Sequence, residues 1–225
     1  MAKTMKNNPA PLANVYTELW RTWGPQHWWP GRTRFEVIVG AILTQNTAWS
    51  NVEKAIRCLR AARALTPRRL HAAPVDQVAE WIRPAGYFNV KARRLRAFTT
   101  LLHTQFNGQL TRLFALDTPS LRRVLLSVNG IGPETADSIL LYAAKRPVFV
   151  VDAYTRRILA RHGWIAPDAD YDAIAQLFTS RLPADVALYN EYHALLVQLG
   201  KTYCRPKPDC AHCPLRHHTP INNGC

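Results

Sequence analysis

The sequence predicts an all-α fold, and the spacing of its apolar residues is the main reason. Apolar side chains recur at helical intervals along almost the whole chain, with proline and glycine separating the periodic segments. The β-like run at residues 148–151 has no partner strand in the sequence. We therefore expect this run to be a buried linker that leads into a helix.

The periodic segments define the expected helices in order. They cover residues 15–23, 35–43, 51–63, 74–81, 91–106, 119–127, 134–144, 153–162, 171–181 and 184–199. Gly130-Ile131-Gly132 joins two of them as a tight hairpin, because glycine reaches positive φ at little steric cost. Pro133 and Glu134 suit the first turn of the next helix, whose free amides form an anion site.

The composition predicts a compact protein with a polyanionic partner. A chain of 225 residues with 48% hydrophobic content can bury one sizeable core or two small ones. Its formal charge of +14 is spread along the chain and attracts polyanions, of which nucleic acid is the leading candidate. A solvated basic surface and affinity for a membrane surface are the alternatives.

The chain carries no signal for membrane insertion or secretion. No apolar run approaches the roughly 20 residues of a membrane span, and residues 1–14 lack the apolar stretch of a signal peptide. We expect a cytoplasmic protein that does not bind a membrane.

The cysteines are concentrated near one end of the chain. Cys58 stands apart, whereas Cys204, Cys210, Cys213 and Cys225 lie within the last 22 residues. This distribution suits a metal site in a reducing compartment better than a disulfide framework.

Four features together resemble the helix-hairpin-helix (HhH-GPD) superfamily of DNA glycosylases, which includes endonuclease III. They are the hairpin, the run at 148–151, the Asp152 that follows this run, and the cysteine tail. The segments 43–47 and 86–92 also resemble that family, so the match covers roughly residues 36–213. The resemblance implies a two-lobed helical fold with a DNA cleft between the lobes. A six-helix core lobe would span residues 33–147, and residues 1–32 with 148–225 would form the second lobe.

The resemblance also implies roles for individual residues and a partner, double-stranded DNA that contains a damaged base. Asp152 would be the catalytic carboxylate, although an aspartate before a helix is often only an N-cap. Gln45 and Tyr87 would enter the duplex as wedges, unless they are a helix-end polar residue and a loop aromatic. The hairpin residues that would hold the DNA backbone are Gly130, Ile131, Gly132, Glu134 and Thr135. The alternative for this hairpin is an ordinary connection in a helical bundle.

Further basic residues follow Tyr87. Lys91, Arg93, Arg94 and Arg96 would contact phosphate or line a solvated helix face.

Glu134 departs from the pattern of the bifunctional family members, which have a lysine there that attacks the sugar. A carboxylate forms no imine, so the chain is predicted to be monofunctional. Trp28, Trp29, Pro30 and Trp49 resemble the base pocket of the 3-methyladenine DNA glycosylases, which are also monofunctional. We expect at least one of the three tryptophans to be mainly structural. Ala153 departs from that branch, which has a lysine after the aspartate.

The cysteine tail resembles the 4Fe-4S loop of endonuclease III. Cys204, Cys210 and Cys213 fit that loop, while Thr219 stands where the family has its fourth cysteine, and Cys225 is the candidate replacement. A structural zinc site that adds His217 or His218 to the three cysteines is the alternative, and a metal-free tail is the remaining one.

These observations lead to one main hypothesis and several rivals. The main hypothesis is a monomeric, monofunctional base-excision DNA glycosylase, associated with the nucleoid through DNA, that removes an alkylated purine such as 3-methyladenine. The rivals are an endonuclease III-like glycosylase/lyase acting on oxidised pyrimidines, a mismatch glycosylase removing adenine or thymine, and a non-catalytic DNA-binding module.

Overall fold

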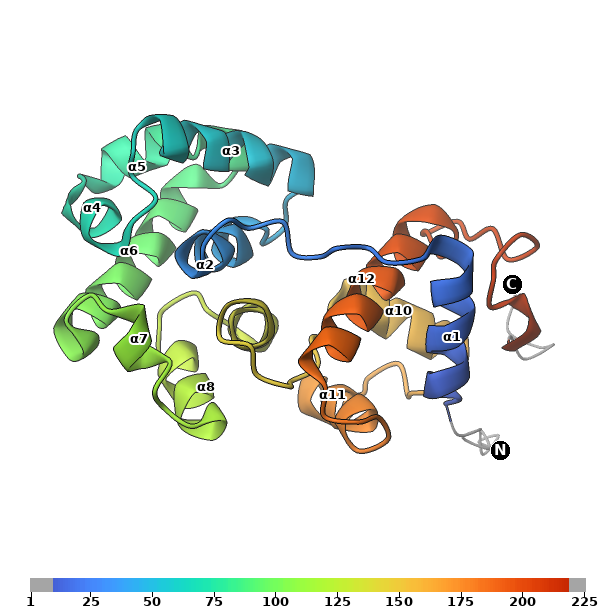
Figure 1. The fold of residues 1–225 in the computed structure, drawn as a ribbon. Coiled ribbons are helices and arrows are strands. Elements are labelled where there is room, and N and C mark those ends of the chain that lie inside the picture. Colours follow the sequence, from blue (N-terminus) through green and yellow to red (C-terminus); the bar gives the residue numbers. More distant parts are fainter. Residues whose placement is uncertain (1–9, 219–225) are drawn as a thin grey trace. The chain divides into compact units, whose positions relative to one another are not determined.

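The computed structural model describes residues 10–218, and its regular secondary structure is entirely helical within that range. The predicted all-α class is confirmed. The chain divides into two compact units, one made of Met1–Trp28 with Pro147–Cys225 and the other of Trp29–Arg146 (Figure 1). We call them the split unit and the continuous unit. No helix in the described range is long and apolar enough to cross a membrane.

The continuous unit is a succession of helices from residue 34 to residue 143. Its elements are α2 (Arg34–Leu43), α3 (Trp49–Ala61), α4 (Pro67–Ala72), α5 (Val75–Trp81), η1 (Arg83–Ala85), α6 (Phe88–Phe106), α7 (Leu110–Leu113), α8 (Thr118–Leu126), α9 (Pro133–Ser138) and η2 (Ile139–Ala143).

Helices α2 and α6 form the centre of this unit. Every residue from Phe35 to Leu43 is buried, as expected of a helix that is apolar on nearly all sides. The long α6 packs against α2, α4, α5 and α7, and α2 also packs against α9 and η2. Thr33 caps α2, because its side chain accepts a hydrogen bond from the Glu36 amide at 3.1 Å.

Lys91 is an unusual member of this core. It is 1% exposed, and its ammonium donates to Leu43 O at 2.8 Å, Thr47 Oγ1 at 2.6 Å and Ala85 O at 2.8 Å. Burial, with the nearby charge of Arg94, lowers the pKa of Lys91 to about 8. The ammonium therefore ties together the end of α2, the loop after it and η1. Both predicted roles of Lys91, a phosphate contact and a place on a solvated helix face, are wrong.

The split unit contains α1 (Leu12–Trp23), α10 (Ala153–Arg161), α11 (Tyr171–Thr179), α12 (Val186–Thr202) and η3 (Arg216–His218). Helix α12 packs against both α1 and α10. The core of the split unit holds an aromatic cluster in which the rings of Phe149 and Phe178 stack with centroids 3.7 Å apart. Phe149, Val150 and Val151 are buried without strand structure, so the predicted linker is confirmed.

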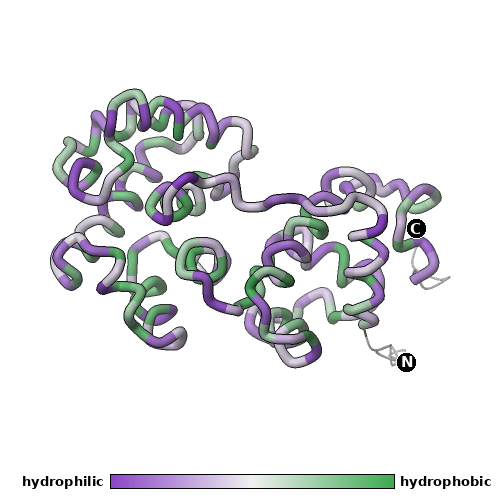
Figure 2. The backbone as a smooth tube through the Cα atoms, in the orientation of Figure 1, coloured by the Kyte–Doolittle hydropathy of each residue, from purple (hydrophilic) through white to green (hydrophobic). Residues whose placement is uncertain are grey.

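The hydropathy of the backbone follows these packing contacts. Apolar and polar residues alternate around the amphipathic helices of each unit, whereas apolar residues dominate α2 (Figure 2). The predicted helices occur with shifted ends, but the short α4 and α7 were not predicted. The predicted helix 134–144 is α-helical only to Ser138 and then continues as the π-helix η2.

Replacing Lys91 by methionine tests the buried ammonium. The change removes the donor to the Leu43 carbonyl, and we expect the free energy of unfolding to fall by about 2–4 kcal/mol. Urea unfolding followed by circular dichroism measures it. Lys54→Met is the matched control, because Lys54 is exposed on α3, and it should change stability by less than about 0.5 kcal/mol. Equal effects of the two changes would contradict this role of Lys91.

Candidate active site

The hairpin between α8 and α9 depends on Gly130. Its φ is +86°, and a Cβ there would lie 2.5 Å from Cγ of Arg94, so both backbone and space require glycine. Ile131 is buried, and its amide donates to Val128 O at 3.0 Å. Gly132 differs, because its φ is −92° and a Cβ would meet nothing within 4 Å. Gly132 is exposed and leads into Pro133 at the start of α9.

The side chain of Gln45 is bound to this hairpin. Its Nε2 donates to Gly130 O and to Thr135 Oγ1, both at 2.9 Å. Its Oε1 accepts from Nη1 of Arg94. Gln45 thus has its donors and its carbonyl oxygen engaged within the protein, which joins the loop after α2, the hairpin and α6.

Glu134 is exposed in the first turn of α9, at the position discussed above for a lysine nucleophile. The helix dipole stabilises a carboxylate there. Lys145 follows η2 and Lys201 lies on α12, and both are exposed, whereas Lys91 is buried. No lysine is therefore found on the hairpin.

Tyr87 is a strained and exposed aromatic residue immediately before α6. Its φ is +46°, which is unusual for a bulky side chain, and 72% of its surface is accessible. The ring contributes little to packing, so its conformation is not explained by the core.

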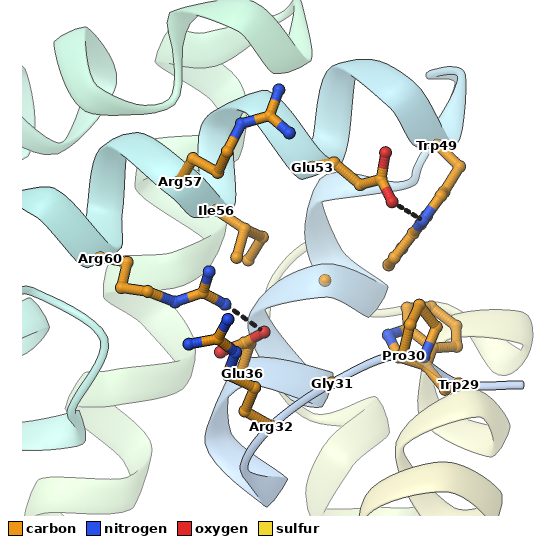
Figure 3. A pocket seen from close by; sticks show the side chains of 11 residues that line it. Trp29, Pro30, Gly31, Arg32, Glu36, Trp49, Glu53, Ile56, Arg57 and Arg60 are labelled. Atoms are coloured by element: carbon orange, nitrogen blue, oxygen red, sulfur yellow. Dashed lines mark hydrogen bonds and ion pairs between the residues drawn. The ribbon is translucent and has the colours of Figure 1, made fainter.

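Trp29, Pro30 and Trp49 line one pocket of about 220 Å³ in the continuous unit (Figure 3). The two indole rings meet edge to face, with centroids 5.0 Å apart and an interplanar angle of 85°. Gly40 on α2 leaves room for the Trp29 ring, because a Cβ at this position would lie 3.1 Å from that ring. Trp49 begins α3 after the turn that follows α2, so no helix joins it to Gln45.

Charged side chains complete the pocket wall. The indole Nε1 of Trp49 donates to Oε1 of Glu53 at 3.0 Å. Glu36 is 7% exposed and pairs with Nη2 of Arg60 at 2.9 Å, so its buried charge is compensated. Arg32 and Arg57 also line the pocket. Its wall therefore combines aromatic faces with charges of both signs.

Trp28 belongs to the split unit, whereas Trp29 belongs to the continuous unit. Trp28 is partly buried. The Trp-Trp-Pro segment thus spans the boundary between the two units in the sequence.

Asp152 is the N-cap of α10 in the split unit. Its Oδ1 accepts from the amide of Thr155 at 2.7 Å, which is the expected capping bond. Its Oδ2 lies 3.6 Å from Nε2 of His193 on α12, and 13% of the aspartate side chain is accessible. Burial by itself raises the pKa of Asp152, but the interactions with His193 and Thr155 outweigh it and hold the pKa below the ordinary value. The carboxylate is therefore ionised at neutral pH.

Sequence reasoning missed His193. It is 6% exposed and is separated from Asp152 by 40 intervening residues, so no local pattern connects the two. Only the packing of α10 against α12 brings them together.

The described cysteines of the tail converge. Cys204, Cys210 and Cys213 line one small pocket, and Cys204 and Cys213 are each 8% exposed. Burial raises the pKa of the Cys213 thiol, and a neighbouring Cys204 thiolate would add to the effect. Nη1 of Arg161 lies 3.4 Å from Sγ of Cys204, and Arg157 donates to the Cys204 carbonyl at 2.7 Å.

This donor set fits a sulfur-ligated metal group in part. Cys204 and Cys213 are free thiols in one pocket, whereas Cys210 in the same pocket is disulfide-bonded, and no three described His, Cys, Asp or Glu residues are arranged as metal ligands. Cys225 lies outside the described residues. The structure gives little support to a zinc site with a histidine ligand, because His217 is exposed and His218 contacts Oε1 of Glu18 at 3.0 Å.

Comparisons with known proteins place this geometry in a family. Residues 39–184 match the HhH-GPD superfamily of base excision DNA repair proteins. A candidate DNA repair glycosylase of Methanocaldococcus jannaschii is 46% identical over 94% of this chain and 97% of its own length. Endonuclease III of Sulfolobus acidocaldarius is 30% identical over 84% of this chain and 83% of its own length.

A solved structure of a DNA glycosylase is also similar to this chain. The 3-methyladenine DNA glycosylase of H. pylori bound to 1,N6-ethenoadenine is 28% identical with a TM-score of 0.70, and the match covers 84% of this chain and 95% of that one. The chain therefore belongs to the HhH-GPD superfamily of base excision DNA repair proteins and is a DNA glycosylase, an enzyme that cleaves N-glycosidic bonds.

Proposed function

We propose that this glycosylase is monofunctional and removes alkylated purines, and that Asp152 is its catalytic carboxylate. The observation that carries the proposal is the pocket in which Trp29 and Trp49 present perpendicular aromatic faces beside Pro30. The similarity to the H. pylori 3-methyladenine enzyme supports the same substrate class.

Asp152 suits hydrolysis of a glycosidic bond. Cleavage develops positive charge on the sugar, and an ionised carboxylate stabilises that charge or orients the attacking water. The capping bond to Thr155 fixes Oδ1, which leaves Oδ2 to act on the reaction. Because the pKa of Asp152 lies below its usual range, the carboxylate stays negative across the physiological range.

The size and surface of the pocket suit a single flipped base. Its volume of about 220 Å³ is below the roughly 300–1,000 Å³ of sites for drug-sized ligands. Two indole faces attract a cationic alkylpurine through cation–π interaction, and Glu53 adds a negative charge beside Trp49. The positive charges of Arg32 and Arg57 offset the negative charge of Glu53, so the attraction for a cationic base comes from the indole faces.

The hairpin and two nearby side chains suit duplex DNA. Gly130, Gly132, Glu134 and Thr135 would form the grip on the phosphate backbone, through amides that hold DNA without reading sequence. Ile131 would support the grip by fixing the shape of the hairpin, because it is buried and its own amide donates to Val128 O. Tyr87 is free to enter the duplex, because its ring is exposed. Gln45 would act as the second wedge only after its amide leaves Gly130 and Thr135. These proposed roles suit a single copy of the chain that acts on one damaged base pair.

A glycosylase/lyase is the second candidate, because the chain is similar to endonuclease III of S. acidocaldarius. Glu134 argues against it, since a carboxylate forms no Schiff base. The buried ammonium of Lys91 is no substitute, because its donors are engaged by three oxygens.

We also propose that Cys204, Cys210, Cys213 and Cys225 hold a 4Fe-4S cluster, with zinc as the alternative. The position of Cys204, Cys210 and Cys213 around one pocket supports this, as does the similarity to endonuclease III, and cluster binding would require the disulfide of Cys210 to be reduced. Arg157 and Arg161 would hold the loop in place through its carbonyls. The cluster would stabilise this loop, which carries Arg205 and Lys207 toward the DNA backbone beside Lys201 at the end of α12.

Single-turnover base release tests the reaction. Duplexes containing 3-methyladenine, 1,N6-ethenoadenine, thymine glycol or a mismatch are incubated with excess enzyme, with and without borohydride. We expect release of the alkylated purine, no covalent adduct, and a loss of about 10²–10³-fold in Asp152→Asn. Asparagine still caps α10, so the fold is retained.

Asp170→Asn is the matched control for that substitution. Asp170 caps α11 in the same unit by accepting from the Ala173 amide at 2.6 Å, and its variant should release base at the wild-type rate. Full activity of Asp152→Asn would overturn the mechanism. A borohydride-trapped adduct would support the lyase, and absence of release from every lesion would overturn the proposed activity.

The two hairpin glycines separate folding from DNA binding. Gly130→Ala forces a strained backbone against Arg94, so we expect it to lower the free energy of unfolding by at least about 1 kcal/mol. Gly132→Ala meets no protein atom within 4 Å and should leave stability unchanged while weakening DNA binding several-fold. Fluorescence anisotropy with undamaged duplex at several salt concentrations measures the binding. Unchanged affinity in Gly132→Ala would contradict close phosphate approach.

Metal analysis of anaerobically purified protein tests the cluster. We expect about four iron atoms and about four sulfides per chain, and their loss in Cys204→Ser. Cys58→Ser is the control, because Cys58 is exposed on α3 of the other unit. One zinc per chain, or no metal, would contradict the cluster.

A further inference from the structure

We propose that His193 is a positioning residue for Asp152, and that base release requires its imidazole to be neutral. The inference rests on the proposed role of Asp152. It concerns the pair formed by Oδ2 of Asp152 and Nε2 of His193, which are 3.6 Å apart within the split unit.

The geometry explains why Asp152 needs a second contact. The capping bond from the Thr155 amide at 2.7 Å is made to Oδ1 and leaves Oδ2 without that restraint. Nε2 of His193 lies 3.6 Å from Oδ2, where it would limit rotation of the carboxylate. The imidazole is itself held, because its side chain is 8% exposed and α12 packs against α10.

The separation of 3.6 Å is longer than a strong hydrogen bond. The contact is therefore electrostatic in the free enzyme. Catalytic hydrogen bonds are often long without substrate and shorten in the complex. A neutral imidazole with a proton on Nε2 can donate to Oδ2 without removing the negative charge that the reaction uses.

Several charged groups on the helices of this unit have partners of their own. On α10, Arg156 donates to Ala169 O, and Arg157 donates to Cys204 O and Gly200 O. On α12, Glu191 accepts from the Gln26 amide. Near the linker, the hydroxyl of Tyr171 on α11 accepts from the Val151 amide at 3.3 Å. On α1, Glu18 contacts His218.

Among these groups, His193 is the one paired with the free oxygen of Asp152, and its charge state sets the field at that oxygen. Histidine is also the side chain that commonly changes charge between pH 5 and 8. Protonation would place a positive charge 3.6 Å from Oδ2 and offset the carboxylate charge that stabilises the sugar cation. Base release should therefore slow as the pH falls through this range.

The test is the pH profile of single-turnover base release from 3-methyladenine duplex, corrected for spontaneous release. In wild type we expect the rate to fall about tenfold or more between pH 8 and pH 5. His193→Asn keeps a donor that does not ionise, so its rate at pH 8 should stay within about threefold of wild type, and the fall toward pH 5 should disappear. His193→Phe keeps a ring without a donor and should lose at least about tenfold at pH 8 with unchanged DNA affinity.

Tyr189→Phe is the matched control on the same helix. Tyr189 is buried and donates its hydroxyl to Leu182 O at 3.4 Å, so its variant also removes a buried polar group from α12. Its pH profile should match wild type. If His193→Phe does not fold, as judged by circular dichroism, the profile of His193→Asn decides the question.

Two results distinguish failure of this inference from failure of the proposed function. If Asp152→Asn is inactive while His193→Asn keeps the wild-type fall toward pH 5, or His193→Phe keeps the wild-type rate, His193 does not position Asp152. If Asp152→Asn is fully active, the proposed role of Asp152 itself is wrong, and this inference is overturned with it.

Discussion

The capping bond between Asp152 and the amide of Thr155 is the contact on which the rest of the proposed site depends. It places a buried, ionised carboxylate at the start of α10 and holds one of its oxygens at 2.7 Å from that amide. A helix N-terminus favours negative charge, so the cap and the proposed catalysis need the same ionisation state. The linker before it contributes by anchoring Val150 and Val151 in the core.

In the continuous unit, too, hydrogen bonds of single polar side chains hold the proposed functional residues in place. The amide of Gln45 joins the hairpin to the end of α2, and the ammonium of Lys91 joins that end to η1. Both side chains are polar groups whose hydrogen bonds go to backbone carbonyls and threonine hydroxyls. The surfaces proposed to meet DNA are thus held by buried and partly buried hydrogen bonds, while Tyr87 and Gly132 stay exposed.

Much of the fold could be predicted because it follows local patterns. The spacing of apolar residues predicts the longer helices, and the Gly-x-Gly segment predicts the turn at Gly130. Helices α4 and α7 have six and four residues, which is too short for periodicity to register. The π-helix η2 reflects a shift of backbone hydrogen bonds, which has no simple side-chain pattern.

The site was less predictable, because its contacts join distant parts of the sequence. The pocket charges Glu36 and Arg60 are 24 residues apart, and His193 meets Asp152 only through the packing of α10 on α12. Lys91 shows the opposite problem, since its charge suggests a surface role that burial excludes. Residue types and motifs indicate the chemistry, whereas tertiary packing decides which side chains take part.

A crystal structure of Asp152→Asn bound to duplex DNA with an alkylated purine tests the central claim most directly. We expect the damaged base to lie against the aromatic wall formed by Trp29 and Trp49, with the side chain at position 152 beside the anomeric carbon of its sugar and still capping α10. A base bound away from these indoles, or a residue 152 remote from the sugar, would contradict it.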